Sequence, residues 1–142
     1  VQIFKEDGTE GTALDLAGLG AVKELSVGER GAGGGIRKLC ISCEKGSVDL
    51  LTEYNIRYVL GAAAEKLKDK NGEPIGMELL PSAYFALTPA KKGYVLDGGG
   101  YGHGIGMSQN GANGMAKAGM KYTEILMKFY QNITIENVYN EE

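Results

Sequence analysis

The residues best suited to chemistry stand in a glycine-dense segment from Gly98 to Gln109. Between positions 100 and 106 every second residue is glycine, and the side chains that alternate with these glycines are Tyr101, His103, Ile105 and Met107. Because successive side chains of an extended chain point to opposite faces, we expect a strand with one face of bare backbone and one face carrying these four. A bare face lets another backbone or a flat ligand approach closely. Because glycine is entropically costly to order, four of them in alternation indicate that either close approach or an unusual φ is required here.

His103 is the only histidine of the sequence, and two interpretations of it stand side by side. In the first, Tyr101 and His103 line a groove and hydrogen-bond a ligand. In the second, the segment crosses a packed core and His103 is a buried histidine with satisfied hydrogen bonds. The residue types alone leave both open, although a tyrosine and a histidine on one face favour the groove.

Ser108 and Gln109 follow, where the pattern changes from extended to helical. Ser108 has the residue type of an N-cap, and the small and apolar residues after it predict a helix from Gln109 to about residue 118, ended by Gly119. Gly111, Gly114 and Ala118 recur at helical spacing, which predicts one close-packed seam. A second helix is predicted over 124–130, with Thr123 as its cap.

Several familiar kinds of site find little support in the sequence. Asp97, His103 and Ser108 have the types of a nucleophilic triad, but an extended segment would spread them rather than bring them together. Cys40 and Cys43 stand three apart within a predicted strand, where their side chains face opposite ways, so we expect two free thiols. We expect no metal and no cofactor, and no complete acid/base pair is visible.

Length and composition predict one globular domain. The chain has 142 residues, of which 43% are hydrophobic, enough for a core. A net charge of −3 argues against a nucleic-acid partner. No apolar run reaches membrane-spanning length and no signal peptide is visible. Because the sequence begins at Val1 rather than at a methionine, we expect a mature or trimmed piece of a longer protein.

The segments before residue 98 predict mostly strands, at 1–5, 22–27, 36–44, 47–52, 82–88 and 94–97, with a further strand at 133–138. Residues 1–20 are otherwise irregular. Lys45-Gly46 predicts a hairpin turn, and a short helix that ends at Gly61 follows Thr52 or Asn55 as its cap. The predicted fold class is therefore α+β, a β-rich single domain with a Gly-rich strand leading into a C-terminal helix pair.

The sequence also resembles a known family. The residues that carry the resemblance in the C-terminal part are the run from Gly100 to Gln109, then Gly111-Ala112, Gly114-Met115-Ala116, Gly119, Tyr122, Glu124-Ile125-Leu126 and Tyr130. Further upstream they are Arg30 with the glycine-rich turn predicted at 29–35, the strand at 36–44 that contains Leu39, Ile56-Arg57, Leu60-Gly61 and Leu80-Pro81-Ser82 to Phe85. Over residues 22–138, these positions resemble the C-terminal part of the stage II sporulation protein D family, which includes the amidase-enhancer proteins.

This resemblance implies work on the bacterial cell wall. The family contains lytic transglycosylases that cut peptide-stripped peptidoglycan glycan strands during sporulation, and its members are exported or membrane-anchored in the cell envelope. The family's catalytic glutamate lies in an upstream segment that no residue of this sequence matches. The resemblance thus implies that residues 1–142 are the C-terminal part of such a domain and contain no catalytic residue. It also implies that the substrate-binding residues are Tyr101, His103, Ser108 and Gln109. The alternative is a non-catalytic glycan-binding or amidase-enhancer module with a cell-wall amidase as partner.

Overall fold

The computed structural model describes residues 2–5, 10, 18–76 and 78–136. The chain forms two compact units, residues 1–103 and 104–142, and each is described here by itself. Within these described ranges, two antiparallel sheets and three helices confirm the predicted α+β class. None of the helices in the described ranges is long and apolar enough to cross a membrane.

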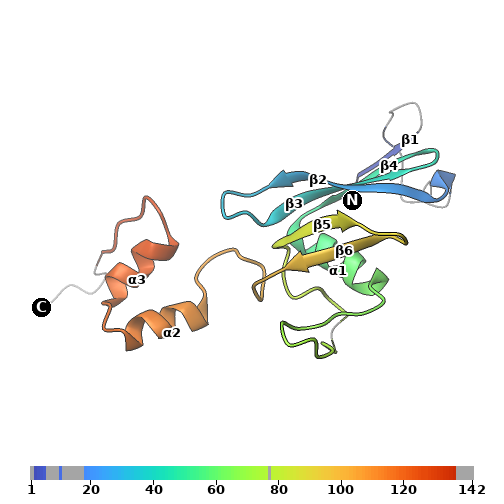
Figure 1. Cartoon of the computed structure of the whole chain (residues 1–142). Coiled ribbons are helices and arrows are strands. Elements are labelled where there is room, and N and C mark those ends of the chain that lie inside the picture. Colours follow the sequence, from blue (N-terminus) through green and yellow to red (C-terminus); the bar gives the residue numbers. More distant parts are fainter. Residues whose placement is uncertain (1, 6–9, 11–17, 77, 137–142) are drawn as a thin grey trace, which may run out of the picture. The chain divides into compact units, whose positions relative to one another are not determined.

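A four-stranded antiparallel sheet forms the larger part of the first unit (Figure 1). Its strands are β1 (Gln2–Lys5), β2 (Val22–Arg30), β3 (Ile36–Cys43) and β4 (Gly46–Leu51), in the spatial order β1-β4-β3-β2. The predicted hairpin after Cys43 is confirmed, and Gly46 with φ 149° closes it. Strand β2 extends three residues beyond the predicted one and carries bulges where it pairs with β3.

Helix α1 (Glu53–Ala63) packs against β3 and β4 and buries Ile56 and Leu60. Thr52 is the N-cap residue, although its side chain makes no capping hydrogen bond. The predicted end of the helix at Gly61 is wrong, because the helix continues to Ala63. Gly61 instead lets the backbone of residues 78–80 approach the helix closely. A Cβ on Gly61 would collide with the backbone of Glu78 and lie 2.8 Å from the backbone nitrogen of Leu80.

The second sheet of this unit is a hairpin of β5 (Phe85–Pro89) and β6 (Tyr94–Gly98). The hairpin lies against β2, where the backbone N–H of Leu25 donates to the Tyr94 hydroxyl at 2.9 Å. One continuous core joins the two sheets and α1; its most deeply buried side chains are Ile36, Leu39 and Ile56. A strand was predicted at 82–88, but β5 begins only at Phe85. Residues 82–84 lie outside the strand and make other contacts.

The second unit contains the predicted helix pair, α2 (Gln109–Lys117) and α3 (Tyr122–Phe129). Ser108 is the N-cap of α2, as predicted, and Gly119 with φ 89° follows the end of this helix. The predicted cap of α3 is wrong: the N-cap is Lys121, whose backbone N–H donates to the Glu124 carboxylate at 2.7 Å. A glutamate three residues into the helix accepts this donor, so Thr123 is not needed as a cap.

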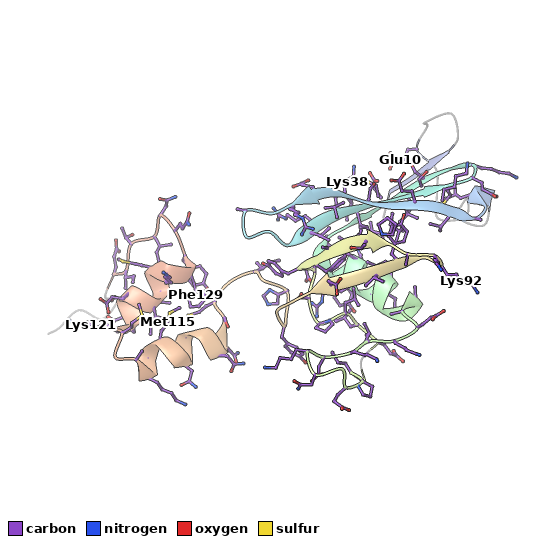
Figure 2. All side chains as sticks on the ribbon, viewed as in Figure 1. Glu10, Lys38, Lys92, Met115, Lys121 and Phe129 are labelled. Atoms are coloured by element: carbon purple, nitrogen blue, oxygen red, sulfur yellow. The ribbon has the colours of Figure 1, made fainter. Side chains whose placement is uncertain are left out.

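The close seam predicted along α2 is present at one end only. A Cβ on Gly111 would lie 3.2 Å from the ring of Phe129 on α3, whereas nothing lies within 4 Å of the Cβ position on Gly114. Met115 and Phe129 are labelled on the two helices in Figure 2. Gly114 therefore lies on the open side of α2, and the prediction for this residue is wrong. Residues 133–136 form no strand, and the rest of the strand predicted over 133–138 lies outside the described residues.

Candidate functional site

The glycine-rich segment does not continue strand β6. The strand ends at Gly98, and residues 99–108 belong to no strand or helix. Gly100, Gly102, Gly104 and Gly106 have φ angles of 86°, 110°, 71° and 86°. The predicted extended strand with a bare face is therefore wrong, and the alternative of an unusual φ at these glycines is confirmed. They adopt the left-handed backbone conformation that other residues rarely adopt.

The first half of the segment is fixed by hydrogen bonds to residues 81–84, in the first unit. The N–H of Gly99 donates to the carbonyl of Tyr84 at 3.0 Å, and the N–H of Gly102 donates to the carbonyl of Pro81 at 2.8 Å. The Ser82 hydroxyl donates to the carbonyl of Gly99 at 2.6 Å and accepts from the N–H of Tyr84 at 3.1 Å. Because Ser82 is only 6% exposed, these bonds are shielded from water and hold the segment in place.

Gly98 brings the segment and β5 into direct backbone contact. A Cβ on Gly98 would lie 2.5 Å from the carbonyl oxygen of Tyr84 and 2.7 Å from the Cβ of Phe85. Gly98 is thus required for close approach, whereas Gly100 and Gly102 are required for their φ angles. Residues 98–102 therefore need glycine for two different reasons, close approach at Gly98 and a positive φ at Gly100 and Gly102.

Tyr101 and His103 lie on the surface of the first unit. The Tyr101 side chain is 84% exposed, and His103 is exposed as well. The interpretation of His103 as a buried core histidine is therefore wrong. An exposed phenol ring on a fixed backbone offers a flat apolar face and a hydroxyl to a ligand.

Ser108 and Gln109 belong to the second unit, at the start of α2. The Ser108 hydroxyl oxygen accepts from the N–H of Gly111 at 3.1 Å, so its capping role is confirmed, and its proton remains able to donate. Gln109 is the first residue of the helix and is exposed. Close by, the N–H of Met107 donates to the Tyr130 hydroxyl at 3.2 Å, which ties the segment to the end of α3. The structure thus divides the four predicted binding residues between the two units.

Tyr84 is a further residue of this region that the sequence did not reveal. A Cβ on Gly35 would lie 3.1–3.4 Å from three ring atoms of Tyr84, and a Cβ on Gly33 would lie 3.3 Å from its hydroxyl. A Cβ on Gly100 would also lie near this ring, 4.0 Å from its Cδ2. Two glycine-rich stretches, far apart in the chain, therefore leave room for one half-buried tyrosine. No local pattern around Tyr84 gives a signal for this convergence.

Asp97 is the acidic residue next to the segment in the sequence. Asp97, at the end of β6, is exposed, and no group of three or more His, Cys, Asp or Glu side chains able to hold a metal ion occurs among the described residues. The region can therefore bind through aromatic faces and backbone groups, and the structure gives no acid/base pair for it in the residues it describes.

A separate charged cluster lies on the sheet, where Asp49 of β4 stands opposite Cys40 of β3. The Asp49 carboxylate pairs with Lys38 Nζ at 2.5 Å (Lys38 is labelled in Figure 2). Burial raises the pKa of the Cys40 thiol, and its hydrogen bond to Asp49 raises this pKa further. Cys40 and Cys43 are free, and Cys40 is held as a neutral thiol rather than as a reactive thiolate.

The second unit has an apolar groove of about 360 Å³ between its two helices. Its lining residues are Met107, Ala112, Asn113, Ala116, Tyr122, Ile125 and Leu126. Few polar groups line it, so the groove suits an apolar segment better than a sugar.

A family model described as "Domain of unknown function (DUF8618)" matches residues 4–106, more than half of the chain. The chain belongs to this family. The DUF8618 match ends inside the glycine-rich segment, so it includes Tyr84, Tyr101 and His103 and stops before Ser108 and Gln109. No solved structure matches the chain.

Curated relatives match this DUF8618 chain over shorter stretches. The amidase enhancer of Bacillus subtilis (strain 168) is 43% identical over 61 residues, which cover 43% of this chain and 9% of that protein. Stage II sporulation protein D of Bacillus amyloliquefaciens is 53% identical over 36 residues, 25% of this chain and 10% of that protein. An uncharacterized protein of Brachyspira hyodysenteriae is 42% identical over 57 residues, 40% of this chain and 16% of that protein. These matches confirm the resemblance seen in the sequence, and they span less than a fifth of each relative's length.

Proposed function

We propose that this chain is the C-terminal part of a cell-wall domain like that of stage II sporulation protein D, and that it contacts peptidoglycan glycan strands through Gly98 to His103. The names of the two Bacillus relatives, an amidase enhancer and a sporulation protein, support a role in the cell wall during sporulation. We further propose that the protein works outside the cytoplasm, in the cell envelope, and that the whole protein is exported or membrane-anchored.

The observation that carries the proposal is the exposed ring of Tyr101 on a backbone fixed on both sides. Hydrogen bonds at Gly99 and Gly102 flank Tyr101, so little conformational entropy is lost when its ring packs on a sugar. Sugar rings have apolar faces and hydroxyl edges, which a tyrosine matches with its ring and its own hydroxyl. His103, two residues further, adds a polar side chain on the same surface segment.

In the enzyme form of the proposal, the whole protein is a lytic transglycosylase of peptide-stripped strands. Its catalytic glutamate would then come from a part of the domain that this chain does not match, and the present residues would bind and orient the glycan. Asp97 is the acidic residue next to the glycine-rich segment in the sequence, and a single acid there agrees with this division of roles. Ser108 and Gln109, which lie in the second unit, are proposed as separate glycan contacts.

A second candidate function is an amidase-enhancing module that binds a cell-wall amidase. The apolar groove between α2 and α3 favours it, because such a lining suits a protein segment, and one relative is named an amidase enhancer. The two functions are separable, since one uses the first unit and the other the second.

Binding of the chain to purified peptide-stripped glycan strands, by sedimentation or calorimetry, tests the first function. Tyr101→Ala should weaken binding about tenfold, because the ring face loses its packing on the sugar. Tyr58→Ala is the matched control, since Tyr58 is also exposed but lies on α1. Equal affinity of the two variants would contradict the proposal.

The whole protein decides between the two functions. A transglycosylase produces anhydro-muramyl ends on stripped strands without any partner. An enhancer produces none, but raises the rate of a purified cell-wall amidase on intact peptidoglycan. If the whole protein does neither, both functions are contradicted.

A further inference from the structure

The turn that joins β2 and β3, residues 31–35, is held against β5 by Arg30. The guanidinium of Arg30 donates to the carbonyl of Gly34 and to the carbonyl of Phe85, both at 2.8 Å. A backbone hydrogen bond from the N–H of Gly31 to the carbonyl of Gly35 closes the turn at 2.8 Å. The turn is thus fixed in place beside Tyr84, the residue that precedes Phe85.

Gly31 and Gly35 face each other across this turn, since Arg30 pairs with Ile36 one position before. Residues directly opposite in an antiparallel pair project to the same face, about 5 Å apart. A Cβ on Gly31 would lie 3.1 Å from Cδ of Arg37, and a Cβ on Gly35 would lie 3.1 Å from Cζ of Tyr84. The Arg37 side chain and the Tyr84 ring therefore each lie against one of the two glycines at the base of the turn, in space that side chains at 31 and 35 would need.

Arg37 is exposed, and none of the residues that the structure describes forms a hydrogen bond or ion pair with its guanidinium. Its planar guanidinium matches a carboxylate through two parallel hydrogen bonds. Tyr84 in turn lies next to Gly100, the residue before Tyr101. Close contacts thus connect the turn that carries Arg37 with the half-buried Tyr84 ring, and this ring with the glycine-rich segment that carries Tyr101.

We propose that Arg37, beside Tyr84, is the specificity-determining residue of this surface, and that it binds the carboxylate of an acidic sugar within the glycan. The inference rests on the proposed glycan-binding function and adds the charge of the sugar and the group that recognises it. A strand whose muramyl residues carry free lactyl carboxylates offers such a group at alternate sugars. A strand of N-acetylglucosamine alone offers none, and an amide-linked peptide removes the charge from the lactyl group.

The test compares two glycans of equal length, a peptide-stripped peptidoglycan strand and a chitin oligosaccharide. The unsubstituted chain should bind the stripped strand about fivefold more tightly, as an exposed ion pair allows, and the difference should shrink as salt is raised. Arg37→Gln should remove this preference and leave chitin binding unchanged, while Arg37→Lys should restore part of it. Lys92→Gln is the control for loss of one positive charge, because Lys92 lies in the turn at the far end of β5 and β6 (Figure 2).

The outcomes separate the two proposals. If the chain binds both glycans equally and Arg37→Gln changes neither, the role of Arg37 is overturned while glycan binding stands. If the chain binds neither glycan, both proposals fail. If Lys92→Gln removes the preference as fully as Arg37→Gln does, the effect is one of net charge, and the site at the turn is overturned.

Discussion

Replacing Gly98 by alanine is the sharpest test of how the glycine-rich segment is held. The added methyl would lie 2.5 Å from the carbonyl oxygen of Tyr84 and 2.7 Å from Cβ of Phe85. The carbonyl is a backbone atom that already accepts the N–H of Gly99, so it cannot move aside without breaking that bond. Overpacking of this kind costs about 1–3 kcal/mol. Loss of glycine flexibility in the unfolded chain returns about 0.4–1 kcal/mol, so a net destabilisation of about 1–2 kcal/mol is expected.

The two following glycines provide matched controls. Gly99 has nothing within 4 Å of its Cβ position and no left-handed φ, so Gly99→Ala should stabilise the unit by about 0.4–1 kcal/mol. Gly100 has φ 86° and only contacts of 3.7 Å or longer, so Gly100→Ala should cost about 1–2 kcal/mol through backbone strain alone. The same substitution is therefore expected to destabilise the unit at Gly98 and Gly100, for two different reasons, and to stabilise it at Gly99.

Thermal unfolding followed by circular dichroism measures these differences, at roughly 4–8 °C per kcal/mol for a unit of this size. The expected order of melting temperature places Gly99→Ala above the unsubstituted chain, and Gly98→Ala and Gly100→Ala below it. A Gly98→Ala variant that melts as high as Gly99→Ala would refute the close approach on which the site rests.

Three other variants test separate parts of the structure. Ser82→Ala leaves the N–H of Tyr84 and the carbonyl of Gly99 without their buried partner, and should lower the free energy of unfolding in urea by about 1–3 kcal/mol. Gly114→Ala should stabilise α2 by about 0.5–1 kcal/mol, seen as slower amide hydrogen exchange, and any destabilisation would mean that the residue is packed. Because Asp49 raises the pKa of Cys40, Asp49→Asn should lower this pKa, and alkylation of Cys40 should then proceed at lower pH; an unchanged pH profile would contradict the hydrogen bond.

The elements that depend on local sequence were predicted well. The hairpin of β3 and β4 and the helix that begins after Ser108 follow from turn residues, alternation and a cap, all within a few residues of one another. The cap of α3 was missed, because a lysine lacks a cap residue's usual side chain and the backbone of Lys121 is satisfied by Glu124 instead.

The roles of individual glycines could not be read from the sequence. Close contact was predicted at Gly114, but the structure has it at Gly61 and Gly98. Whether a glycine is in close contact depends on segments far away in the chain, which the local sequence does not reveal. The alternate glycines after residue 98 were consistent both with a bare strand and with an unusual φ, because both need the same residue type, and only the structure decides for the φ. Tyr84 was missed for the same reason: the glycines that surround it are about fifty and about fifteen residues away along the chain.

The central claim is that the first unit contacts glycan through its glycine-rich segment and the turn before β3. A titration of the isotope-labelled chain with peptide-stripped glycan strands, followed by the backbone amide resonances in NMR spectra, tests it most directly. We predict shifts at the amides of residues 99–103 and 33–37, with little change in α1. Shifts confined to α2 and α3, or none at saturating glycan, would contradict the claim.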